Sequence, residues 1–178
     1  MGSSIRRAME VENSVEIIAA SATITRPADT TAYASGDLVA NSVTATAVNA
    51  LQFSAPRDSG GKGRVVGARI MKSTNSVTNA AFRLHLFTAI PTFVTSGDNT
   101  AMTTVVVASA KGYLGYVDVT AMTGFSDVAW GTGAVDSSRL AMPFIAVDTV
   151  LYGIVEARGA YTPGSAEVFT LSLMVQQN

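Results

Sequence analysis

The residues that could carry out chemistry are few, and they do not fall into a catalytic pattern. There is one histidine and no cysteine, so disulfides and thiolate metal sites are excluded and His-based triads have little to draw on. Glycoside hydrolysis needs two carboxylates that face each other across the scissile bond. The candidate aspartates mostly stand beside Gly, Ser or Thr, where turn roles are usual. They are Asp118, Asp127, Asp136 and Asp148.

Three further groupings resemble functional sites only in part. The run Gly60–Gly63 contains a lysine, but no Ser or Thr follows Lys62 and a strand comes next, so it is not a P-loop. Gly97, Asp98 and Asn99 lack the spacing of an EF-hand calcium loop. His85 alternates with apolar neighbours, which is typical of a partly covered histidine on the polar face of a strand. GxSxG, HExxH and GxGxxG motifs are absent. We therefore expect no catalytic, cofactor-binding or metal-binding residue, and a protein that is not an enzyme.

The clearest structural pattern runs from Gly63 to Phe87. It predicts two antiparallel strands joined by the polar turn at 73–79. In the first strand, Val66, Ala68 and Ile70 fall on one side, between Arg64 and Lys72 at the ends. In the second strand, one face is apolar and the other polar, as the two-residue period of a half-buried strand requires. The apolar face has Phe82, Leu84 and Leu86, and the polar face has Arg83 and His85.

The rest of the chain also favours strands. Residues 26–36 and 56–63 are expected to be loops, 99–103 offers at most a marginal helical turn, and 121–139, which contains Trp130, has no readable period. Short strands without an amphipathic helix predict an all-β fold: an antiparallel β-sandwich, jelly-roll-like, spanning 15–178 as one domain, preceded by a flexible N-terminal arm at 1–14. Further strands are expected at 15–25, 38–39, 43–48, 51–53, 105–108, 112–119, 140–147, 150–158 and 167–175.

The composition and charge of the chain argue against some classes of function. Of the 178 residues, 14% are charged, against about 25% in typical domains. The net charge is −1 with no basic stripe, so nucleic-acid binding is not expected. The longest apolar runs fall short of a membrane-spanning helix. Small and β-branched residues fill the place of the missing charges, which favours close contacts between subunits.

Four ordered blocks resemble a family of small virion-associated proteins encoded by tailed bacteriophages. The blocks are Ile24–Val39, Gly60–Ser73, Phe82–Met102 and Leu151–Gln177. The resemblance implies a capsid decoration (cement) protein that binds the outer surface of the phage head. It implies the major capsid protein as partner, a homotrimer as the assembled form, synthesis in the cytoplasm of the bacterial host, and a final location on the virion. It carries over no site residue.

An alternative from the residues themselves is a tail- or fibre-associated module that binds a receptor or glycan. Exposed aromatic side chains such as Trp130 and Tyr161 would support it, because sugars stack on aromatic rings. Trp130 is otherwise expected to be an anchor in the core or in an interface. A third alternative, a glycan hydrolase, would use two of the aspartates between 98 and 148.

Overall fold

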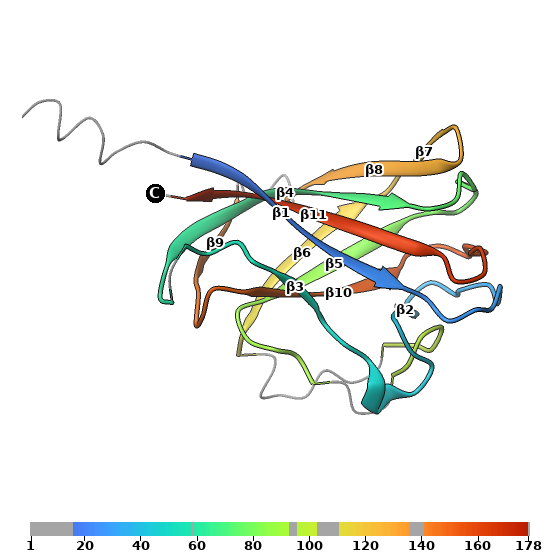
Figure 1. Ribbon diagram of the computed structural model, residues 1–178, viewed down its shortest axis with the longest axis horizontal. Helices are drawn as coiled ribbons and strands as arrows, with labels where there is room; N and C mark the ends of the chain where they lie inside the picture. The colour runs from blue at the N-terminus through green and yellow to red at the C-terminus, as the bar shows by residue number, and fades with distance from the viewer. Residues whose placement is uncertain (1–15, 58, 93–95, 103–110, 136–140, 178) are drawn as a thin grey trace, which may run out of the picture.

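The computed structural model describes residues 16–57, 59–92, 96–102, 111–135 and 141–177, which form two antiparallel sheets packed face to face (Figure 1). The expected all-β sandwich is confirmed; the arm at 1–14 lies outside the described residues. The first sheet contains β1 (Glu16–Thr25), β11 (Val168–Gln177), β4 (Lys62–Lys72), β8 (Val128–Ala134), β7 (Thr123–Phe125) and β9 (Met142–Ile145). The second contains β2 (Leu38–Val39), β3 (Leu51–Phe53), β10 (Leu151–Ala157), β5 (Phe82–Phe87) and β6 (Tyr113–Val119).

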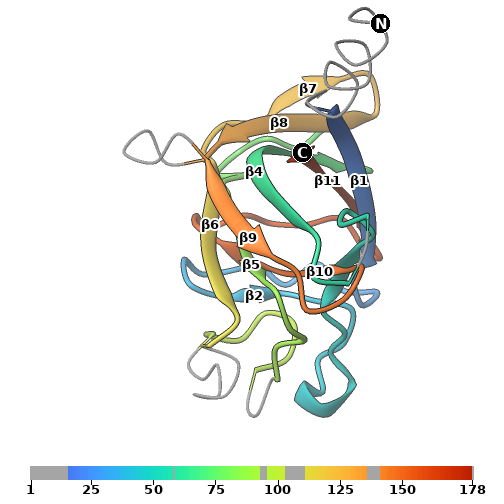
Figure 2. The same ribbon diagram turned by 90° about the vertical axis from the view of Figure 1, so that its left-hand side faces the viewer.

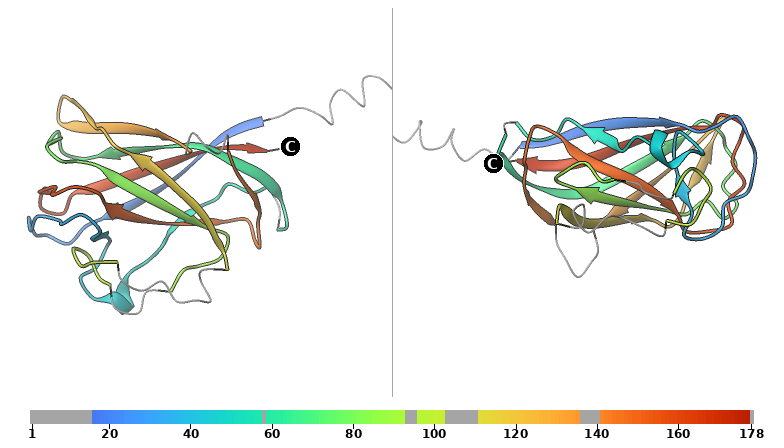
Figure 3. Two further views of the ribbon diagram at one scale, coloured as in Figure 1. Left: turned by 180° about the vertical axis from the view of Figure 1, so that it is seen from behind. Right: turned by 90° about the horizontal axis from the view of Figure 1, so that it is seen from below.

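The strand order agrees with the expected jelly-roll-like arrangement. The order is β1-β11-β4-β8-β7 in the first sheet and β2-β10-β5-β6 in the second. β9 lies end to end with β8 along β4, and β3 lies end to end with β2 along β10. Apart from β2 to β3, β5 to β6 and the run from β7 to β9, each step along the chain crosses to the other sheet, as Figures 2 and 3 show. Jelly rolls alternate between two sheets in this way.

The core fills the space between the two sheets with the apolar rows that the sequence predicts. On β5, Phe82, Leu84 and Leu86 are fully buried. The facing row on β11 is buried to the same extent, and Phe82 packs edge-on against Phe169 with ring centroids 5.3 Å apart. Each such side chain contributes about 1.5–3 kcal/mol when it leaves water. These rows therefore hold the two sheets together.

The expected pairing of the two central strands is wrong. β4 and β5 are both strands, but β4 pairs with β11, β8 and β9, whereas β5 pairs with β10 and β6. Both strands carry one apolar face, and these faces meet across the core instead of lying side by side. The turn at 73–79 therefore carries the chain from one sheet to the other.

The residues of β4 that face the core differ from the expected row because the strand contains a β-bulge. The register passes from Met174 opposite Gly67 to Val175 opposite Val65, so Val66 is the extra residue. Because one inserted residue reverses the alternation, Val65 is fully buried and Val66 only half-buried. Ala68 and Ile70, on the far side of the bulge, lie in the core as expected.

Several expected elements differ from the structure. Residues 43–48 do not form a strand: Ala45–Ala47 is a 3-10 helix, in a loop that the Asn41 side chain closes through Ala47 and Asn49. Residues 98–100 form a turn, and the strand expected at 105–108 lies outside the described residues. The strand expected at 140–147 is only Met142–Ile145, and the unreadable 121–139 contains β7 and β8. In the part of the chain that the structure describes, no helix is long and apolar enough to cross a membrane.

Candidate functional site

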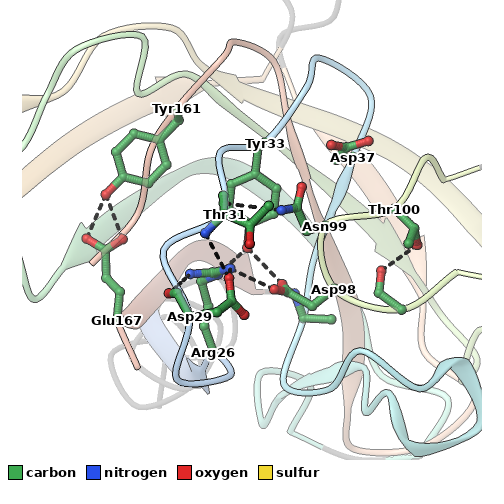
Figure 4. Close-up of polar contacts among 12 residues, drawn as sticks. Arg26, Asp29, Thr31, Tyr33, Asp37, Asp98, Asn99, Thr100, Tyr161 and Glu167 are labelled. Carbon is green, nitrogen blue, oxygen red and sulfur yellow. Dashed lines mark hydrogen bonds and ion pairs between the residues drawn. The ribbon is translucent and has the colours of Figure 1, made fainter. Parts of the chain in front are cut away.

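A buried charged network lies where the loops after β1 and before residue 102 meet (Figure 4). Asp98 accepts hydrogen bonds from the Tyr33 hydroxyl at 2.7 Å, the Arg26 guanidinium at 2.8 Å and the Ala40 amide at 2.7 Å. The Arg26 and Asp98 side chains are both fully buried. Burial, reinforced by Asp98, raises the pKa of Tyr33, so its hydroxyl remains a donor. Asp98, considered above for calcium, therefore belongs to a structural ion pair.

A second buried pair joins β4 to the turn before β11. The Lys72 ammonium lies 3.3 Å from Glu167, and Tyr161 donates its hydroxyl to the same carboxylate at 2.6 Å. Lys72 also lies 4.9 Å from the centroid of the Tyr161 ring. The expectation that Tyr161 is exposed is wrong, since it is fully buried. This group is also structural.

His85 lies on the outer face of the second sheet, as the alternation of β5 predicts. Its Nδ1 is 3.0 Å from the Tyr113 hydroxyl and its Nε2 is 3.0 Å from Glu156, which also accepts a hydrogen bond from Arg158. Burial lowers the pKa of His85, against the raising effect of Glu156. A neutral ring fits these partners if Nε2 donates to Glu156 and Nδ1 accepts from Tyr113.

The chain Tyr113–His85–Glu156 has the connectivity of a relay triad, but its electrostatics are unfavourable for nucleophilic catalysis. An activated nucleophile needs a lowered pKa or an effective adjacent base. Burial instead raises the pKa of Tyr113, and the pKa of the adjacent base is lowered. The arrangement therefore fixes a tyrosine at the surface rather than activating it.

Next to this histidine, Arg83 and Asp118 form a bidentate ion pair with distances of 2.7 and 2.8 Å. The Arg83 guanidinium stacks 3.7 Å from the centroid of the Tyr116 ring. Tyr113 is 42% exposed and packs against Phe87, with centroids 5.2 Å apart. We call this surface the tyrosine face, defined by Arg83, His85, Tyr113, Tyr116 and Asp118. It offers rigid aromatic rings beside fixed polar groups, which suits the binding of a polar ligand.

The remaining aspartates do not assemble into a site. Asp127 lies in the turn between β7 and β8, and Asp148 accepts hydrogen bonds from the Val150 amide and the Tyr152 hydroxyl. Asp136 lies outside the described residues. Within the described ranges, no group of three His, Asp or Glu side chains could hold a metal ion.

The outer face of the first sheet is broad and nearly uncharged. By register and burial, its charged side chains are Lys62, Arg64 and Arg69 of β4, and none of its outward positions in the described strands is acidic. Large apolar side chains stand exposed on it. They are Ile17, Phe125, Trp130 and Ile145. Small or uncharged residues fill the space between them: Ala19, Ser21, Thr23, Thr25, Thr123, Thr132, Ala134, Pro143, Thr170, Ser172, Met174 and Gln176.

Neither surface is predictable from the sequence, because each is built from strands that pair although they lie far apart in the chain. Trp130 is 42% exposed and pairs with Met71 and Thr123. Its expected role as a core anchor is therefore wrong, whereas the interface and ligand-stacking roles stay predictions. The pairing of β4 with β8 gives no local signal in the sequence.

Comparison of the chain with models of known protein families and with curated proteins finds no match.

Proposed function

We propose that the protein is a structural component of a tailed-phage virion, a capsid decoration protein that binds the outer surface of the head. The observation that carries this proposal is the outer face of the first sheet. In its described strands, four exposed large apolar side chains lie among small uncharged ones, and three side chains are charged. The resemblance of four ordered blocks to phage virion proteins points in the same direction.

A face of this kind suits attachment to another protein surface. Ala, Ser and Thr lose little rotamer freedom when they are covered, so burying them costs little conformational entropy. Exposed apolar side chains gain free energy when a partner removes them from water. A monomer that stayed in solution would gain nothing from this composition. We therefore assign the outer face of the first sheet to contact with the major capsid protein.

The proposed action is mechanical and needs no catalytic residue. A protein that binds the assembled shell but not its separated subunits stabilises the shell by linkage. A homotrimer, the form that the resemblance implies, would combine three weak contacts into a firm attachment. The protein would be made in the cytoplasm of the bacterial host and act on the virion.

The deciding experiment counts copies of this chain against the major capsid protein in purified particles of the encoding phage. A ratio near one supports decoration of the whole head, and a few copies per particle would move the protein to the tail or to a single vertex. Absence from the particles would overturn the proposal.

A rebinding assay tests the face itself, with particles that lack the protein. Thr132→Glu puts a carboxylate on the outer face of the first sheet, on β8 opposite Arg69 of β4, and we expect it to weaken binding at least tenfold. Gln52→Glu is the matched control, because Gln52 is exposed on β3 of the second sheet. Equal binding by the two variants would refute the assignment of this face to the capsid contact.

A second candidate function, a receptor- or glycan-binding module of the tail or fibre, is favoured by the tyrosine face. Tyr113 is exposed beside a fixed Arg83–Asp118 pair, whereas the earlier candidate Tyr161 is buried. Glycan-array binding that Tyr113→Ala abolishes, together with a few copies per particle, would favour this function. No binding to any glycan would remove it.

A further inference from the structure

β1 is the edge strand of the first sheet. Among the described strands it forms a ladder with β11 alone, over ten residues without a bulge, and β3 of the second sheet lies close to it without pairing with it. The Arg26 amide donates to the Glu167 carbonyl across this pair at 3.1 Å. Hydrogen-bonded and non-hydrogen-bonded residue pairs alternate along an antiparallel ladder. The even-numbered residues of β1 therefore form backbone hydrogen bonds with β11. The odd-numbered ones point their backbone groups away from the sheet: Ile17, Ala19, Ser21, Thr23 and Thr25.

These outward backbone groups have no partner among the described backbone hydrogen bonds. All five residues are exposed. Natural proteins block such edges with lysine, proline, a bulge or a very short strand. β1 has none of these, and its only charged residue, Glu16, stands at the strand end. The opposite edge of the first sheet, β7, has only three residues, and the β2 and β3 edge of the second sheet is split into two short strands.

We propose that this edge pairs with β1 of a second copy, antiparallel about a two-fold axis, so that two first sheets join into one. The pairing must keep outward side chains on the outward face. A two-fold axis at Ser21 does this, because it places Ser21 opposite Ser21 and Ala19 opposite Thr23. It also brings the outward-pointing amides and carbonyls of the two strands opposite one another, as a hydrogen-bonded ladder requires.

Three features of β1 point to a second copy as the occupant. Self-pairing opposes only small or β-branched side chains, with no like charges face to face. Ser21 already pairs with a serine on its other side, since its hydroxyl lies 2.8 Å from that of Ser172. On the inner face, Ile18 and Ala22 pack against the core but stay only partly buried, and pairing would cover both. An interface in which each copy offers the same surface is the commonest form of homodimer.

The test is the mass of the full chain in solution, measured by light scattering over a range of concentrations. Ser21→Lys places two lysines opposite each other at the two-fold axis. Ser172→Lys is the matched control, because it removes the same serine pair and adds the same charge one strand further in. We expect an even-numbered wild-type assembly, with twice the mass of the Ser21→Lys protein, and an unchanged mass for Ser172→Lys. Equal masses for wild type and Ser21→Lys at every concentration would overturn the proposal.

Ser21→Pro gives a second variant that should still fold, because the amide it removes points away from β11. Circular dichroism and urea unfolding confirm that each variant is folded before its mass is compared. We expect Ser21→Pro to have half the wild-type mass as well. A folded Ser21→Pro protein with the wild-type mass would contradict the pairing.

Amide hydrogen exchange separates the second copy from other occupants. We expect the odd-numbered amides of β1 to be protected in the wild-type assembly and to exchange at least tenfold faster in Ser21→Lys. Protection at monomer mass that disappears when residues 1–14 are deleted would assign the edge to the arm and overturn the proposal. Fast exchange of these amides in the assembled wild type would place the interface elsewhere. None of these measurements involves phage particles, so their outcome is independent of the test of the decoration function.

Discussion

The ammonium group of Lys72 lies 3.3 Å from a carboxylate oxygen of Glu167, and neither side chain is exposed to solvent. The carboxylate also accepts a hydrogen bond from the Tyr161 hydroxyl, which lies 2.6 and 2.8 Å from its two oxygens, and another from the Thr74 hydroxyl. Lys72 donates in addition to the Thr74 carbonyl at 2.9 Å. Each charged group thus has several partners, which is the condition under which a buried ion pair is tolerated. The pair fixes the end of β4 to the turn that begins β11.

Replacing Lys72 with methionine should destabilise the protein strongly. The substitution leaves Glu167 as a buried carboxylate without a counter-charge, and breaking a buried pair from one side costs about 3–5 kcal/mol. Urea unfolding would measure the loss. The double variant Lys72→Met/Glu167→Gln should recover most of it, because no charge then remains buried. Lys62→Met, on the exposed start of β4, is the control, and a Lys72→Met loss no larger than this control would contradict the prediction.

The same reasoning applies to Asp98→Asn at the other buried network. The amide cannot balance the Arg26 guanidinium, and it turns an acceptor of three hydrogen bonds into a group that is part donor. We expect a loss of about 3–5 kcal/mol, which lowers the melting temperature by roughly 2–4 °C per kcal/mol in a protein of this size. Calorimetry would measure the shift. Asp127→Asn, in the exposed turn before β8, should change the melting temperature by less than a degree or two, and similar shifts for the two variants would refute the assignment.

The pKa of His85 predicts a loss of stability in mild acid. Burial holds it below the ordinary value of 6.5. As the pH falls below 6.5, the unfolded chain therefore takes up a proton that the folded protein takes up only at lower pH. Stability then falls with falling pH across this window, because the unfolded state binds more protons. The His85→Gln variant lacks this contribution, so its urea midpoint should change less than that of the wild type between pH 7 and pH 5.5.

An NMR titration checks the same group directly. The chain has one histidine, so its ring resonances need no assignment by mutagenesis. We expect the ring to titrate below 6.5 in the folded protein and near 6.5 in urea. A folded-state pKa at or above 6.5 would mean that the attraction of Glu156 outweighs burial, and the sign of the pH dependence would reverse.

The sequence predicts the strands whose residues alternate cleanly. β5 and β11 each place a continuous apolar row against the core, and both lie within two residues of the expected bounds. Alternation reports which residues of a strand are buried, but not which strand lies beside it. For this reason the sequence predicts that β4 and β5 pair, whereas they lie in different sheets with their apolar faces toward each other. The bulge at Val66 cannot be predicted from the sequence either, because it follows from the register of β4 with β11.

The sequence predicts less about the candidate surfaces than about the fold. The outward placement of Arg83 and His85 follows from the alternation of β5, whereas their partners come from β6 and β10, more than 25 residues away in the chain. The burial of Lys72 and Tyr161 has no local signal either, since a lysine at a strand end normally reaches water. Long-range pairing decides both cases.

The glycines of β8 mark a place where two strands from different sheets come very close, and this gives a further prediction. Val117 forms a bridge with Val135 next to the end of β8. A methyl group at Gly133 would overlap the Asp118 carbonyl and would lie 2.8 Å from a methyl carbon of Val117. Gly in a strand often marks such an approach, and it also erases the apolar period that would have revealed β8.

Gly133→Ala should therefore force β6 and β8 apart and destabilise the protein by at least the 1–3 kcal/mol typical of overpacking. The obstacle is backbone, which cannot turn aside as a side chain could. Thr132→Ala on the same strand points outward and should change the free energy of unfolding by no more than about 0.5 kcal/mol. Urea unfolding of the two variants decides the matter. If Gly133→Ala were as stable as Thr132→Ala, the two sheets would not approach as closely at this corner as the structure places them.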